Sequence, residues 1–185
     1  MFLNFYIYTL FFEKLYFYDN ILYLENYNSY HKKMIHILTG LPHNKNNDKN
    51  VCINFSKSVG HKIILGSSTM KMYCRELNIK AKIEILKTDN LPTPKYLIDG
   101  IDIASEGVLT LNEIYALLLN NKSANSEAEQ IVHLIKTENE IRFTVGTANN
   151  KEFEFYKQNN LLPRVEIIEK IVTLLKDKTV KVNYI

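Results

Sequence analysis

The sequence predicts a layered α/β domain whose mostly parallel sheet is flanked by helices. The apolar run at Ile63–Leu65 ends at Gly66 and passes at once into a segment with helical spacing. Strand-like and helix-like segments then alternate to the C-terminus. The 185 residues, 46% of them hydrophobic, suffice for one core. Because parallel strands need long crossover connections, this alternation favours a parallel sheet.

The stretch Lys62–Leu77 organises the prediction. Its helical part places apolar side chains on one face, at Met70, Tyr73, Cys74 and Leu77. A strand that turns into a helix at Gly66 exposes backbone N–H groups at the positive end of the helix dipole, where an anion can bind. An ordinary βα turn, capped by Ser67 or Ser68, explains the same pattern without a ligand.

Met1–Tyr30 differs in composition from the rest, and we expect an aromatic-rich appendage to a single domain over residues 31–185. The apolar run Met1–Phe12 is too short to span a bilayer and has no signal-peptide flanks. An aromatic strand pair, an interfacial anchor and a partner-binding arm are three interpretations. A poorly ordered product of an AT-rich reading frame is the one we favour, because an interfacial anchor needs a basic face.

The first elements of the domain are predicted to be helical. His31–Leu41 has the pattern of a short helix that Gly40 ends. Pro42–Asn50 is a polar loop or the start of the next helix, and Val51–Ser58 continues as helix. After the central stretch, Lys82–Leu86 alternates as a strand.

Two prolines and two capping patterns shape the second half. Pro92 and Pro94 exclude helix, so short extended pieces are expected on either side of an Asp99-Gly100 turn. The capping boxes Thr110–Glu113 and Ser126–Glu129 each open a helix. The remaining predicted segments are the strand Glu140–Gly146, the loop Thr147–Leu161, a helix that begins near Pro163, and the strand Thr179–Ile185.

Glycine and hydroxyl residues concentrate in three stretches that are candidates for a binding site. In an open α/β sheet, ligands bind outside the carboxyl ends of strands, where the Gly66–Thr69 turn lies. If the other stretches fold over this turn, the site suits a polar or phosphorylated ligand, or an anion bridged by a divalent cation. The alternative is a simple turn at Asp99-Gly100 and a surface carboxylate at Glu106. The candidate ligand-binding residues are Gly66, Ser67, Ser68, Thr69, Asp99, Gly100, Asp102, Glu106, Gly107 and Thr110.

Composition argues against several classes of protein. The net charge of +3 is small and spread along the chain, so we expect no nucleic-acid partner. Cys52 and Cys74 have no ligand spacing, which indicates a reducing, cytoplasmic compartment without structural zinc. No nucleophile elbow, phosphate-binding loop or metalloprotease motif is present, so no catalytic residue, metal ligand or cofactor is assigned.

The candidate stretches resemble the C-terminal region of bacterial SpoIIE-like protein serine/threonine phosphatases. The resemblance rests on Lys62–Thr69, on Pro92 and Pro94, and above all on Asp99–Leu111, which contains Glu-Gly-Val-Leu-Thr-Leu. Phe143–Asn149, Leu162–Arg164 and Val180–Tyr184 are also similar, so the resemblance covers about residues 34–185.

The resemblance implies an accessory domain, not the enzyme. Phosphatases of this family carry an upstream domain with aspartates that bind manganese or magnesium, and Met1–Tyr30 is too short to be that domain. We therefore expect a truncated chain that acts as a sensor or interaction module, with a phosphatase domain or a phosphoprotein as partner. The chain departs from the family at Ser67, Ser68 and Ser105, where Gly or Thr is expected, and this leaves the preference of an anion-binding turn open.

Overall fold

The computed structural model describes residues 34–86, 93–120, 126–148, 156 and 158–185. The aromatic stretch Met1–Tyr30 and part of the predicted loop 147–161 lie outside the described residues. Within the described part, no helix is long and apolar enough to cross a membrane.

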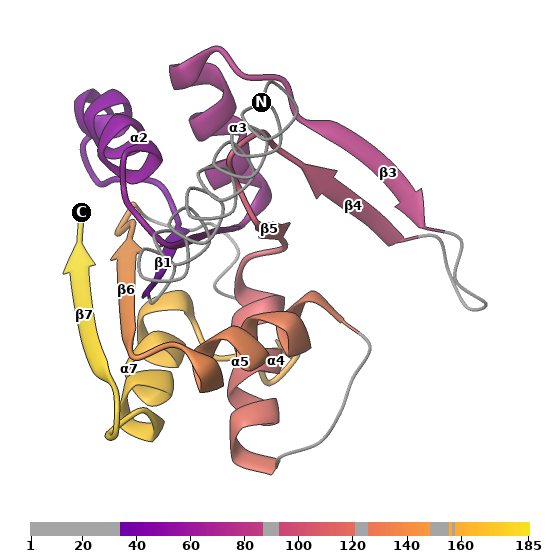
Figure 1. The fold of residues 1–185 in the computed structure, drawn as a ribbon, viewed down its shortest axis with the longest axis vertical. Helices are drawn as coiled ribbons and strands as arrows, with labels where there is room; N and C mark the ends of the chain where they lie inside the picture. Colours follow the sequence, from indigo (N-terminus) through magenta and orange to yellow (C-terminus); the bar gives the residue numbers. More distant parts are fainter. Residues whose placement is uncertain (1–33, 87–92, 121–125, 149–155, 157) are drawn as a thin grey trace, which may run out of the picture.

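The predicted α/β architecture is confirmed by a parallel sheet of five strands (Figure 1). In spatial order, these are β5 (Ile103–Ser105), β2 (His61–Leu65), β1 (Met34–Thr39), β6 (Glu140–Val145) and β7 (Thr179–Tyr184). All four neighbouring pairs are parallel. The chain builds the sheet outward from β1 through β2 to β5, and then crosses to the other side of β1 with β6 and β7. This is the strand order of a doubly wound sheet, which reverses direction between β1 and β6.

Alternate residues of the central strands face two separate cores. Ile35, Ile37 and Ile63 pack with α4 (Val108–Asn120), α5 (Glu127–Thr137) and α7 (Arg164–Leu174). Leu38 and Ile64 pack with α2 (Asp48–Ser56) and α3 (Ser67–Leu77) on the other face. Because successive side chains of a strand point to opposite faces, a strand buried on both sides is apolar at nearly every position.

The helix expected at His31–Leu41 is wrong, because Met34–Thr39 forms the central strand β1. Met34, Ile37 and Leu38 do have helical spacing, but with Ile35 they form a nearly continuous apolar run. Such a run is typical of a strand buried on both faces, and periodicity cannot distinguish it from a short buried helix. Gly40 then ends a strand, not a helix.

The predicted strand at Lys82–Leu86 exists as β3, but it lies outside the main sheet. It pairs antiparallel with β4 (Thr93–Leu97) in a two-stranded sheet of its own. Figure 1 shows this hairpin projecting from the body of the domain. Ile83 on it is 62% exposed, so the hairpin adds little to the core.

One of the two capping boxes is corrected. The helix α4 begins at Val108, so Thr110 lies inside its first turn, buried, with its hydroxyl 3.1 Å from that of Ser105. Ser126 does cap α5, because its side chain accepts a hydrogen bond from the N–H of Glu129 at 3.3 Å.

Candidate functional site

A cleft of about 450 Å³ lies at the carboxyl edge of the sheet. It is bounded by the segments that follow β1, β2, β5 and β6, so it spans the point where the strand order reverses. This is the position at which doubly wound sheets bind ligands. The volume falls within the range of small-molecule sites. Its lining residues are Gly40, Leu41, Gly66, Ser67, Ser68, Thr69, Glu106, Gly107, Val108, Leu109, Ala148, Tyr156 and Arg164.

The first turns of three helices open onto this cleft: α3 at Ser67, α4 at Val108 and α7 at Arg164. The N-cap residues of α3 and α7, Gly66 and Pro163, make no side-chain cap hydrogen bond. The alternative of a turn capped by Ser67 or Ser68 is not observed, because α3 begins at Ser67 with Gly66 as its N-cap. Uncapped N–H groups at the positive ends of helix dipoles make a favourable environment for an anion.

Gly66 is required by the backbone at this turn. Its φ of 112° and ψ of 132° lie in a region that side chains with a Cβ rarely adopt. The loop after β5 also comes close, since a Cβ added to Gly107 would lie 3.2 Å from the Cα of Gly66. The two glycines thus bring the starts of α3 and α4 together on one side of the cleft.

A second pair of glycines brings the loops after β1 and β6 together. A Cβ on Gly146 would lie 2.2 Å from the carbonyl oxygen of Leu41 and 2.4 Å from the carbonyl carbon of Gly40. Gly146 also donates its N–H to the carbonyl of Thr39 at 2.8 Å. The guanidinium of Arg164 lies beside this contact and donates from Nη1 to the carbonyl of Gly146 at 3.3 Å. Arg164 thereby places a positive charge in the wall of the cleft.

Two polar side chains hold the cleft walls in place. Thr69 is buried, and its hydroxyl accepts a hydrogen bond from the N–H of Gly40 at 2.8 Å, which ties the loop after β1 to α3. Asn112 of α4 bonds both to the N–H and to the carbonyl of Leu162, at 3.0 and 3.1 Å, just before α7. These bonds fix the starting points of the helices against one another.

His36 lies in β1, one of the two strands between which the strand order reverses. Its Nε2 is 2.9 Å from the hydroxyl of Thr144 on β6, and its ring packs edge-on against Phe55. Burial, together with the positive charges of Arg142 and Lys62, lowers the pKa of His36 to about 4. The imidazole is therefore neutral at physiological pH.

The structure brings together part of the predicted site. Gly66, Ser67, Ser68, Thr69, Glu106 and Gly107 line the cleft. Thr110 lies one turn into α4 and bonds to Ser105 instead. Asp99, Gly100 and Asp102 are not at the cleft, which corrects the expectation that they fold over the Gly66–Thr69 turn.

Asp102 lies at the amino edge of the sheet because it pairs with the start of β2. Its carboxylate accepts the N–H of Lys62 at 2.9 Å and lies 3.4 Å from Nδ1 of His61, close enough for an ion pair but not aligned as a hydrogen bond. The Asp99-Gly100 turn precedes it, as predicted. A separate hollow of about 560 Å³ opens there, lined by His61, Asp102, Ile103, Leu117, Glu129, Gln130, Val132, His133, Leu134 and Lys136.

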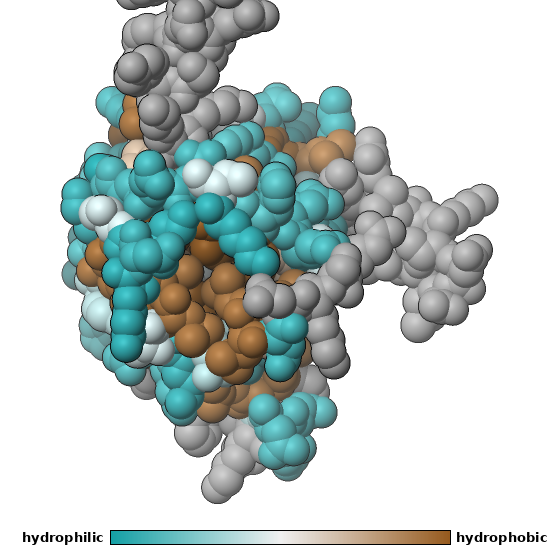
Figure 2. Space-filling model, turned by 60° about the horizontal axis from the view of Figure 1, so that its bottom comes forward, coloured by the Kyte–Doolittle hydropathy of each residue, from teal (hydrophilic) through white to brown (hydrophobic). Residues whose placement is uncertain are grey.

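Figure 2 brings forward the end of the molecule opposite the cleft and shows an apolar area framed by hydrophilic side chains.

Among the described residues, no group of three or more His, Cys, Asp or Glu side chains is placed to hold a metal ion. Both cysteines are free, and burial raises the pKa of Cys52 to about 12, so its thiol is unreactive.

Several residues of the cleft were not among the predicted site residues, notably Gly40, Tyr156 and Arg164. A signal for Gly40 is present, since Ile37-Leu38-Thr39-Gly40 repeats the pattern of Ile63-Ile64-Leu65-Gly66: an apolar run that ends at a glycine. Two such runs are what two adjacent parallel strands leave in a sequence. Nothing local marks Arg164, because its place depends on how α7 packs.

Comparison with known proteins identifies no relative: no family model matches the chain, and no curated protein or solved structure matches it.

Proposed function

We propose that the chain is a ligand-binding α/β domain that holds a small phosphorylated molecule in the cleft at the carboxyl edge. The observation that carries this proposal is the opening of three helix N-termini onto one cleft. At two of these termini the N-cap residue, Gly66 or Pro163, makes no side-chain cap, and Arg164 adds a positive charge. Backbone N–H groups and a guanidinium are the usual ligands of phosphate in proteins.

Glu106 gives the cleft a second chemical character. Its exposed side chain lies just before α4, among the lining residues. Glu106 follows β5 at one end of the sheet, whereas Arg164 begins α7, which connects β6 to β7 at the other end. A carboxylate repels phosphate but accepts hydrogen bonds from hydroxyl or amino groups. The cleft therefore favours a molecule with a phosphoryl group at one end and hydroxyl or amino groups at the other.

The resemblance to SpoIIE-like phosphatases favours a non-catalytic role for this binding. Four residues of its most specific stretch, Glu106 to Leu109, line the cleft, so part of the similar stretch lies at the proposed site. On this view the chain is an accessory sensor domain, and its partner is a phosphatase domain or a phosphoprotein. Purified protein should then release no phosphate from phosphoserine peptides with manganese present, and turnover would contradict the accessory role.

An enzyme acting on a phosphorylated small molecule is the second candidate, and Glu106 favours it. A carboxylate beside a bound substrate can act as a general base. The two candidates separate once a ligand is known, because an enzyme consumes the ligand and a sensor returns it unchanged. Loss of turnover in Glu106→Gln would support the enzyme.

The binding proposal can be tested with inorganic phosphate, followed by NMR of the backbone amides. We expect the amide signals of Ser67, Ser68 and the first turn of α7 to shift together in a saturable titration. Ser67→Pro should weaken binding several-fold, because it removes one N–H donor at a helix position where proline is tolerated. Ser67→Ala keeps that N–H and should bind nearly as the parent does.

The matched control is Glu127→Pro, at the corresponding first position of α5, which lies away from the cleft. It should leave the phosphate titration unchanged. If Ser67→Pro folds and binds phosphate as tightly as Ser67→Ala does, the N–H groups of α3 do not bind the anion and the proposal is wrong.

A further inference from the structure

A second hollow of about 450 Å³ lies between α3 and the residues that follow β1. It shares Leu41, Ser68 and Ala148 with the cleft, so the two hollows adjoin. Its far side is made by the loop after β1, by the 3-10 helix η1 (Lys45–Asn47) and by the first turn of α2. A ligand seated at the start of α3 can therefore extend into it past Ser68.

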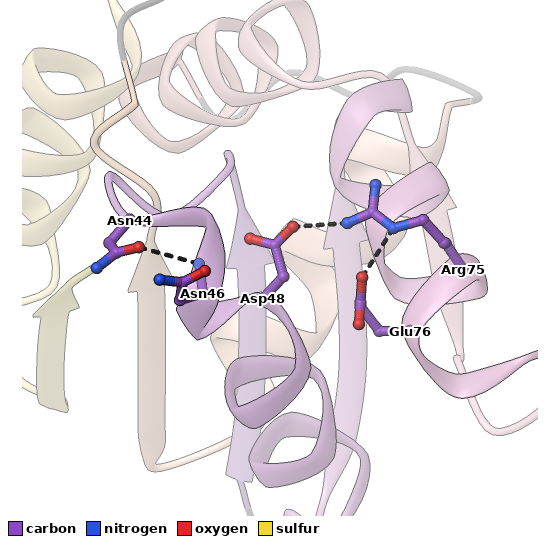
Figure 3. Close-up of polar contacts among 5 residues, drawn as sticks. All are labelled: Asn44, Asn46, Asp48, Arg75 and Glu76. Carbon is purple, nitrogen blue, oxygen red and sulfur yellow. Dashed lines mark hydrogen bonds and ion pairs between the residues drawn. The ribbon is translucent and has the colours of Figure 1, made fainter.

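This hollow, which we call the basic groove, is lined by more positive than negative side chains. Its lining includes the cations of Lys45, Lys71 and Arg75 and a single carboxylate, that of Asp48. Figure 3 shows that Asp48 and Arg75 are already paired, at 2.6 Å, and that Arg75 also bonds to Glu76 at 2.7 Å. The two carboxylates more than offset the charge of Arg75, and the pair with Asp48 links α2 to α3.

Lys45 and Lys71 are the two remaining cations of the basic groove. Both are exposed, and neither makes an ion pair in the part of the chain that the structure describes. Lys45 begins η1, whose first turn is closed by the Asn44 side chain accepting from the N–H of Asn46 at 3.0 Å (Figure 3). The backbone that carries Lys45 is thus held in place.

Lys71 follows Ser68 by three residues in α3, so both side chains lie on the same side of the helix. The distance along the axis is less than one turn of about 5.4 Å. An ammonium at Lys71 therefore lies within reach of a second anionic group attached directly to one that occupies the first turn of α3.

From these contacts we infer that the ligand carries two adjacent anionic groups, as a diphosphate does: one at the helix N-termini and one between Lys45 and Lys71. This inference rests on the proposed function and adds the class of ligand to it. Two phosphoryl groups in a row match two adjoining hollows, with Ser68 among the residues shared at their boundary. A monophosphate would leave both lysines without a partner.

The test compares inorganic pyrophosphate with inorganic phosphate by calorimetric titration of the full chain, without divalent cations and at constant ionic strength. We expect pyrophosphate to bind about tenfold more tightly, the gain of roughly one charge-assisted contact. The double variant Lys45→Ala/Lys71→Ala should lower this preference to about threefold or less and leave the affinity for phosphate nearly unchanged. Lys49→Ala and Lys176→Ala, exposed lysines outside the groove, should keep the full preference.

The possible failures are distinguishable. If phosphate binds and Ser67→Pro weakens it, but pyrophosphate gains nothing or its gain survives the double variant, the diphosphate inference is wrong and the proposed function stands. If neither anion binds, both are wrong. If Lys49→Ala or Lys176→Ala lowers the preference as much as the double variant does, the gain is a general charge effect and the basic groove is not the site.

Discussion

The carboxyl edge of the sheet and its amino edge each carry a hollow, of about 450 and 560 Å³, yet their surroundings are opposite in character. At the carboxyl edge, α3, α4 and α7 begin and leave N–H groups at the cleft. At the amino edge, the lining comes from Leu117 near the end of α4 and from the body of α5, and the carboxylate of Asp102 is already paired.

The difference follows from the topology of the sheet. A helix that follows a parallel strand begins at the carboxyl edge and returns to the amino edge, so the positive ends of the helix dipoles gather at one edge only. Two hollows of similar size therefore differ in the ligands they favour. Size alone does not identify a site, whereas the direction of the surrounding helices indicates which hollow suits an anion.

The largest effect is expected from adding a methyl group where the loops of the carboxyl edge touch. Gly146→Ala would place its Cβ against the backbone of Gly40 and Leu41, which cannot move aside as a side chain can. We expect a loss of more than about 3 kcal/mol in the free energy of unfolding, measured by urea denaturation. Gly100→Ala, near the amino edge, meets no atom within 4 Å and carries only the strain of a φ of 77°, about 1 kcal/mol. Equal losses for the two variants would contradict the close contact of the loops.

The next effect is a pH dependence centred on β1. The pKa of His36 is about 4 in the folded chain and about 6.5 when unfolded, so the unfolded state takes up the proton first as the pH falls. Stability from this group is fully present above pH 6.5 and is lost between about pH 6.5 and 4, by about 2 kcal/mol after allowance for partial exposure.

Substitution of His36 isolates its contribution to the pH dependence of stability. His36→Gln should flatten the loss of stability across that pH range, as followed by urea denaturation at several pH values. His133→Gln, an exposed histidine at the amino edge, should leave the profile unchanged. If the His36→Gln profile keeps the slope of the parent, another group causes the acid sensitivity.

A smaller effect compares one hydrogen bond at each edge. Thr69→Val removes the acceptor of the buried Gly40 N–H and should cost about 2 kcal/mol, whereas Thr69→Ser keeps the acceptor and should cost less. Asp102→Asn should cost under about 1 kcal/mol, because its side chain is 36% exposed and the amide oxygen can still accept from Lys62. Thermal or urea unfolding ranks the three variants, and a larger loss for Asp102→Asn than for Thr69→Val would reverse the comparison.

Elements with strong periodic patterns could be predicted from the sequence. The strand β2, the turn at Gly66 and the helix α3 are as expected, and so are α5, β6 and β7, because alternation and helical spacing record which face of each element is buried. The pattern of the central strand β1 predicts a helix instead, because burial on both faces erases alternation. Its one sequence signal is the run that ends at Gly40 as the β2 run ends at Gly66, and its position between β2 and β6 identifies it as the centre of the sheet.

The candidate site was also predicted only in part from the sequence. Gly66–Thr69, Glu106 and Gly107 carry local signals, glycine and hydroxyl residues where a strand turns into a helix, and all of them line the cleft. Asp99, Gly100 and Asp102 carry similar turn signals, but they precede β5 whereas Glu106 follows it. A difference of a few residues along a three-residue strand moves a side chain from one edge of the sheet to the other.

The amino-acid pattern alone therefore determines that this protein is an α/β domain with a turn at Gly66 able to present N–H groups to an anion. Local pattern suffices for this because propensity, capping and the burial of one face act within a few residues. Which loops meet at that turn is a property of the strand order. Placing β1 beside both β2 and β6 brings Gly40, Arg164 and the start of α4 to Gly66, across separations of up to about a hundred residues that no local pattern spans.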